Sequence, residues 1–138
     1  MPVSTASKLK QFARRLLDYE AARGKSAHAR EAAALRVCEK LRGPLGKLMG
    51  GGGFRSLLSR ALVLAGAEVP WLQGLQLQAD GSLEGLKEVE VKLDQPAITE
   101  GELVLVSQLL GLLVTFIGPA LTSSLLRDIW PEMEELNF

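Results

Sequence analysis

The stretch LVLVSQLLGLLVTFIGPALTSSLL, which spans residues 103–126, carries no charged side chain. Its 24 residues exceed the roughly 20 that an α-helix needs to cross a bilayer. The same composition suits the central helix of a soluble bundle, because a helix that is apolar on nearly every side has to be buried. The fold class therefore depends on whether the rest of the chain contains helices that can cover this stretch.

Three earlier segments supply the partners that a central helix needs. Apolar residues recur at helical spacing near 9–16, 34–41 and 54–65, so each segment predicts an amphipathic helix with one face to bury. The flanks of 103–126 lack the basic cluster that orients a membrane span, since acidic residues precede it and Arg127 is followed by an aspartate. We therefore expect 103–126 to form the core of a soluble bundle.

Between residues 74 and 93 the hydrophobic period changes from helical to two. Leucines alternate with glutamines before an Asp80-Gly81 turn, and valines alternate with charged residues over 88–93. Alternation on either side of such a turn predicts an antiparallel β-hairpin, which must lie on the helices because two strands are not stable alone. We expect this hairpin at about 74–93.

Glycine and proline mark the predicted ends of the helices. Gly43 and Pro44 should stop the second helix, and Pro119 should kink or break the long apolar one. Thr99 is a candidate cap for the start of the apolar helix, because Glu102 follows at capping-box spacing. Residues 43–53 are the best candidate for a hinge.

Together these patterns predict a mainly α fold. We expect one domain over residues 1–138, a helical bundle around a central apolar helix at about 100–130, with the small hairpin beside it. A chain of this length and 47% hydrophobic composition can bury a core without disulfides. The single cysteine and the absence of an uninterrupted apolar N-terminal segment favour a cytoplasmic protein.

The residue types that carry catalysis are few. The one histidine, His28, precedes the one cysteine, Cys38, by ten positions, which is ~15 Å of rise on a helix and too far for a thiolate–imidazole pair. We therefore expect a non-catalytic protein, with no metal site and no cofactor.

A run of four glycines ends at the start of the third helix, where backbone amides can hold an anion. The candidate anion-binding residues are Gly51, Gly52, Gly53, Arg55 and Ser56. The Walker pattern of Gly-Lys-Ser/Thr is absent from this loop. A flexible connector is the simpler interpretation.

Small and polar residues form a narrow seam along the apolar stretch at spacings of three and four. After Gln108, the seam consists of Gly111, Thr115, Gly118 and Thr122. Such a seam indicates close approach of a neighbouring backbone within the chain, the edge of the helix that meets solvent, or a face for self-association. We carry these four residues forward as candidate interface residues.

Charge is distributed unevenly along the chain. Residues 1–63 hold 13 Lys or Arg and 4 Asp or Glu, a net +9, whereas residues 64–138 hold 3 and 12, a net −9. Opposite charges on two halves can meet across a two-fold interface, and apolar surface beyond what a small bundle covers also favours association. The sequence thus predicts a self-associating protein–protein interaction or regulatory module.

We expect this module to be a homodimer held mainly by apolar contacts, partly from the 103–130 helix, with a second protein partner as a further option. Two alternatives belong to other classes. One is a nucleic-acid-binding protein that uses the basic half, 1–63. The other is a membrane-associated protein that spans the bilayer at 103–126, which the amphipathic neighbours make the less favoured interpretation.

Overall fold

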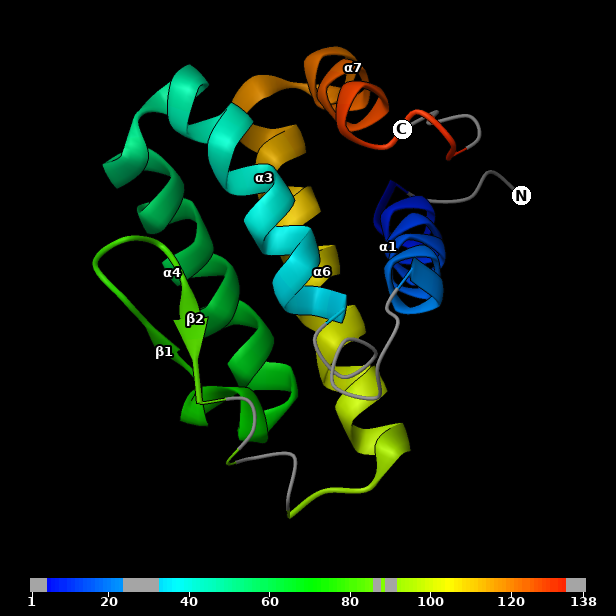
Figure 1. Cartoon of the computed structure of the whole chain (residues 1–138), viewed down its shortest axis with the longest axis vertical. Coiled ribbons are helices and arrows are strands. Elements are labelled where there is room, and N and C mark those ends of the chain that lie inside the picture. The colour runs from blue at the N-terminus through cyan, green and yellow to red at the C-terminus, as the bar shows by residue number, and fades with distance from the viewer. Residues whose placement is uncertain (1–4, 24–32, 86–87, 89–91, 134–138) are drawn as a thin grey trace.

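The computed structural model describes residues 5–23, 33–85, 88 and 92–133. Within them, five α-helices and a two-stranded antiparallel sheet confirm the mainly α bundle with a small hairpin (Figure 1). The helices are α1 (Thr5–Arg23), α3 (Ala33–Met49), α4 (Gly51–Glu68), α6 (Gln95–Ile117) and α7 (Pro119–Ile129). The remaining elements are a 3-10 turn, η1 (Pro70–Gly74), and the strands β1 (Gln76–Leu77) and β2 (Leu83–Glu84).

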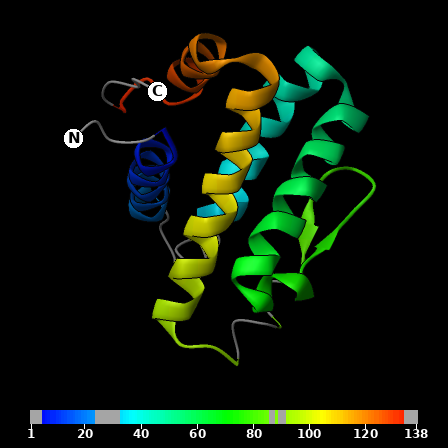
Figure 2. The same ribbon diagram turned by 180° about the vertical axis from the view of Figure 1, so that it is seen from behind.

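Helix α6 lies at the centre of the bundle, as the uncharged stretch predicts. It contacts α1, α3, α4 and α7, and its residues Gly101–Val106 are all buried. Seen from behind, α6 runs between α1 and α4 with one face turned outward (Figure 2). Among the described helices, α6 is also long and apolar enough to cross a membrane, but half of its most apolar stretch is buried inside the bundle.

The break at Pro119 confirms the prediction for this position. Gly118 adopts φ +85°, a left-handed conformation that favours glycine, and α7 starts at the next residue. The predicted cap at Thr99 is wrong, since Asp94 caps α6 and its Oδ1 accepts from Ala97 N at 3.1 Å. Pro96 fits the first turn because the missing N–H has no helical partner there.

The predicted stop at Gly43 and Pro44 is also wrong, because α3 continues through both residues to Met49. Proline removes one helical hydrogen bond, but Leu41 and Leu45 on either side are fully buried and hold the helix on the core. The chain turns instead at Gly50, which has φ +83° and separates α3 from α4. Hinge motion in 43–53 stays a prediction.

The hairpin is shorter than expected and its second strand lies earlier. Leu77 pairs with Leu83 around the predicted Asp80-Gly81 turn, where Gly81 N donates to Gln78 O at 3.0 Å. The second strand was expected over 88–93. Residues 89–91 lie outside the described residues, and residues 92 and 93 form a turn and a bend. The tight turn at Asp80-Gly81 pairs the residues that lie directly on either side of it, so the second strand begins at Leu83.

Candidate functional site

The outward face of α6 contains a groove of about 250 Å³. It lies between α1 and α4, the helices on either side of α6 in Figure 2. We call it the α6 groove. It is lined by Leu9, Lys10, Glu68, Val104, Ser107, Gln108 and Gly111. Leu9 and Val104 are themselves buried, so the groove has an apolar floor.

Small residues shape the α6 groove. A Cβ added to Gly111 would lie 3.8 Å from Leu9 Cδ1. Because glycine has no side chain, this part of the groove between α1 and α6 stays open. The hydroxyl of Ser107 donates to Leu103 O at 2.7 Å, and that of Thr115 donates to Gly111 O at 3.0 Å. Thr115 lies one turn beyond the groove. Because both hydroxyls bond to their own helix, neither demands a polar partner on this face of α6.

The two rims of the α6 groove carry opposite charges. Lys10 on α1 forms one rim, and Glu68 on α4 forms the other. Glu68 Oε2 also accepts a hydrogen bond from Gln108 Nε2 at 2.9 Å, which orients the carboxylate over α6. A partner with the reverse arrangement of charge would therefore fit both rims.

Apolar side chains are exposed where α6 passes into α7. We call residues 115–121 the α6–α7 corner. Phe116 is 68% exposed and Leu121 is 46% exposed, and Pro119 and Ala120 between them are exposed as well. Single exposed apolar residues are common on soluble proteins, whereas several together typically mark an interaction site.

The predicted interface residues separate in the structure. Gly111 and Thr115 lie on the outward side of α6, and Gly118 is half-buried at the break. Thr122 is fully buried on α7, with its hydroxyl donating to Gly118 O at 2.7 Å. The break in the helix therefore removes Thr122 from the surface that Gly111 and Thr115 share.

The sequence pattern did not identify the most exposed members of this surface. Phe116 and Leu121 stood out in no periodicity, because their exposure depends on where the neighbouring helices end. Lys10 and Glu68 belong to helices far apart in the sequence, so only the fold places them on opposite rims of one groove. Local sequence carries no signal for such a pair.

The candidate anion site is placed differently from the expectation. Gly51, Gly52 and Gly53 form the first turn of α4, and Ser56 is exposed one turn later. Arg55 Nε donates to Gln78 O at 3.1 Å, so this guanidinium holds the hairpin rather than facing the glycines. Anion binding at this turn stays a prediction.

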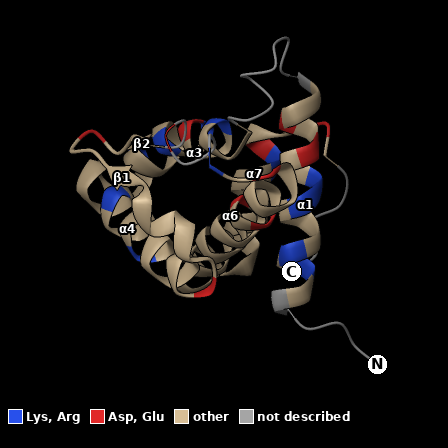
Figure 3. Ribbon diagram, turned by 90° about the horizontal axis from the view of Figure 1, so that it is seen from below, with Lys and Arg blue, Asp and Glu red and all other residues tan. Residues whose placement is uncertain are grey.

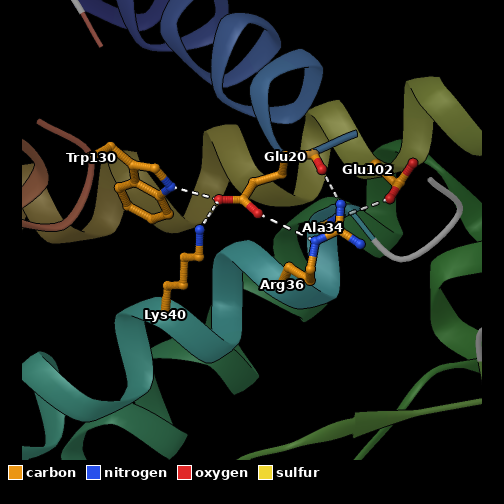
Figure 4. A network of polar contacts seen from close by, with 6 residues as sticks. All are labelled: Glu20, Ala34, Arg36, Lys40, Glu102 and Trp130. Atoms are coloured by element: carbon orange, nitrogen blue, oxygen red, sulfur yellow. Dashed lines mark hydrogen bonds and ion pairs between the residues drawn. The ribbon is translucent and has the colours of Figure 1, made fainter. Parts of the chain in front are cut away.

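A buried carboxylate connects three parts of the bundle (Figure 4). Glu20 of α1 is only 1% exposed and accepts from Lys40 Nζ at 2.5 Å, Trp130 Nε1 at 2.8 Å and Arg36 Nε at 3.3 Å. Burial would raise the pKa of Glu20, but the hydrogen bonds from Lys40 and Trp130, with the charge of Lys40 and the bond from Arg36, lower it overall. Lys40 also lies 5.9 Å from the centre of the Trp130 ring.

This carboxylate fits a structural role. A group held ionised by several donors neither gives nor takes a proton readily near neutral pH. It instead fixes the end of α7 to α1 and α3. A second buried carboxylate, Glu102, accepts from Ala34 N at 3.0 Å and so caps the first turn of α3 (Figure 4).

The groups considered for catalysis do not converge in the described residues. Burial raises the pKa of the Cys38 thiol to about 12, with Glu39 and Glu102 adding to the effect, so the reactive thiolate is scarce. His28 lies outside the described residues. Within 5–23, 33–85, 88 and 92–133, no cluster of three His, Cys, Asp or Glu residues could hold a metal ion.

Comparison with known proteins adds no assignment. The sequence matches no protein-family model, and neither the curated proteins nor the solved structures include a significant match to it.

Proposed function

We propose that this chain is a non-catalytic, self-associating helical interaction module that works in the cytoplasm. The observation that carries the proposal is the exposed α6–α7 corner, in which Phe116 and Leu121 leave large apolar side chains in water. Covering a phenylalanine or leucine side chain contributes roughly 1.5–3 kcal/mol. A partner that buries both residues from each subunit gains enough to offset a substantial part of the cost of association.

The distribution of charge supports a second copy as that partner. The described ion pairs join residues of the basic half to one another, namely Arg36 and Lys40 with Glu20, and Arg42 with Glu39. Exposed acids of the other half, such as Glu68 and Glu100, remain on the surface. A second copy brings a basic half to meet them, while apolar contacts supply most of the free energy because exposed ion pairs are worth under about 1 kcal/mol each.

The test is the oligomeric state of the purified chain and of variants in the corner. Light scattering at micromolar concentration should give twice the chain mass of 14.9 kDa, in low and in high salt. Phe116→Asp combined with Leu121→Asp should give the monomer mass. Val63→Asp is the matched control, since Val63 is 70% exposed on α4, outside the corner.

A wild-type chain that stays monomeric over the micromolar range would overturn the self-association. The same surface would then be free for a second protein partner. A corner variant that remains dimeric with unchanged affinity would instead remove the α6–α7 corner from the interface.

Nucleic-acid binding is the second candidate, and the outer face of α1 favours it. Lys8, Lys10, Arg14 and Arg15 are all exposed on this helix, and Figure 3 shows basic positions along α1. Phosphate contacts would use these charges. The test is the affinity for a mixed-sequence duplex or single strand near physiological salt. Submicromolar binding that collapses with added salt, and that weakens in Arg14→Glu with Arg15→Glu, would place this candidate first.

The membrane alternative finds less support in the bundle. The stretch 103–126 is divided between α6 and α7 at Gly118, so its length does not form one continuous helix. Glu102, directly before the stretch, is buried against the start of α3. Both features suit a helix that packs in protein.

A further inference from the structure

The rims of the α6 groove carry opposite charges, which match those of a second copy turned to face it. We infer that two chains associate through it with a two-fold axis that runs along α6, so that Lys10 of each copy faces Glu68 of the other. The inference rests on the proposed self-association and specifies its surface and its geometry.

Small residues on the outward side of α6 leave room between the two rims for side chains of a second copy. Gly111 has no side chain, Ser107 is small, and its hydroxyl is already bonded to Leu103 O. Leu9 and Val104 give the floor an apolar lining but are only 5% and 6% exposed, so most of the apolar contact comes from the α6–α7 corner.

The charges of the rims select one orientation of the second copy. With the two-fold axis along α6, the α1 rim of one chain lies over the α4 rim of its partner, and Lys10 meets Glu68 twice. With the axis across α6, Lys10 would face Lys10 and Glu68 would face Glu68, which costs free energy at an interface. The favoured arrangement therefore has the two α6 helices parallel.

A parallel pair also unites the two apolar corners. Because both α6 helices then end on the same side of the dimer, the α6–α7 corners of the two copies lie next to each other. Phe116 and Leu121, which are the exposed apolar residues of this corner, gain a partner of the same composition. The groove and the corner thus become one continuous isologous interface.

Reversal of the charges tests the pairing directly. Lys10→Glu alone and Glu68→Lys alone should each weaken the dimer at least tenfold, because each places like charges together twice. A mixture of the two variants should form a heterodimer with an affinity near that of the wild type, since both pairs are then attractive again. Lys47→Glu and Glu84→Lys are the matched controls, as both residues are exposed and neither lines the groove.

Two further variants separate the effect of the charge pairing from other causes of a weaker dimer. Glu68→Gln removes the charge but keeps an oxygen for Gln108, so weakening by this variant cannot come from the loss of that hydrogen bond. Thr115→Cys should form an intermolecular disulfide readily, because a parallel pair brings each Thr115 to its counterpart. Val63→Cys, exposed on α4, is the control for random collision.

The outcomes separate this inference from the proposal on which it rests. A wild-type monomer overturns both. A wild-type dimer whose affinity ignores both charge reversals, and whose Thr115→Cys variant crosslinks no faster than the control, overturns the groove while self-association stands. An affinity near that of the wild type in the mixture, but not in either single variant, supports the two-fold pairing. If the affinity recovers only when Lys10→Glu and Glu68→Lys are placed in the same chain, the two rims pair within that chain.

Discussion

Trp130 and Glu20, 110 residues apart in the sequence, are joined by a hydrogen bond of 2.8 Å from the indole Nε1 to the carboxylate. Both side chains are almost fully buried. Trp130 directly follows the last residue of α7, so this bond fixes the C-terminal helix against α1. Lys40 brings α3 into the same contact at 2.5 Å, and the stability of the bundle should depend on all three groups.

Trp130→Phe should destabilise the fold by about 1–3 kcal/mol. The phenylalanine ring retains much of the apolar contact but leaves Glu20 without one donor, and hydrogen bonds to charged groups are worth about this much. Urea unfolding followed by circular dichroism measures the change. A loss no larger than that of an exposed control such as Glu84→Gln would show that the bond contributes little.

The network should also make stability depend on pH below the ordinary pKa of Glu20, which is 4.5. Hydrogen bonds and charge lower the pKa of Glu20 in the folded state, so its contribution is complete above this value and is lost as the pH falls through the folded pKa. The free energy of unfolding of the wild type should therefore fall more steeply between about pH 5 and pH 3 than that of Glu20→Gln. Parallel curves for the two proteins would contradict this assignment.

Much of the fold was predictable because the apolar pattern within single segments of the sequence decides it. The uncharged stretch and the three apolar stripes require one helix inside and three around it, and α6 with α1, α3 and α4 follows this pattern. The errors lie where tertiary contacts override local preference. Pro44 stands inside α3 because buried Leu41 and Leu45 hold the helix on the core, and local sequence does not reveal that support.

Less of the candidate site was predictable. The seam of small residues pointed to Gly111 and Thr115, which do lie on the outward side of α6. The same periodicity included Thr122, which is buried because the helix changes direction at Gly118. A periodic pattern assumes one straight helix, so it loses its meaning beyond such a break.

Leu113→Ala should cost about 2–5 kcal/mol of stability. Leu113 is fully buried on α6, and truncation of such a leucine leaves a cavity that the core cannot fill. Leu48→Ala is the matched control, because Leu48 is 49% exposed on α3 and should lose far less. Chemical denaturation of both variants measures the difference, and equal losses would show that α6 is not the centre of the core.

Cys38 should react slowly with thiol reagents in the folded protein. Its side chain is buried and its pKa is raised to about 12, so both access and thiolate are limiting. The rate of labelling at neutral pH should rise with urea in step with unfolding. Fast labelling in buffer, at the rate of an exposed cysteine such as Val63→Cys, would show that α3 opens without global unfolding.

The choice between bundle and membrane for the uncharged stretch can be tested by fractionation. If α6 is a core helix, the expressed chain should remain in the supernatant after high-speed centrifugation without detergent, because its buried side packs on α1, α3 and α4. A protein that inserts its helix stays with the membranes after high-salt and alkaline washes. Phe116→Asp with Leu121→Asp is the informative control, since it removes apolar surface at the corner and leaves the buried residues of α6 intact. A chain that binds membranes only through that corner would be released by this variant, whereas a spanning helix would be retained, and retention would overturn the soluble bundle.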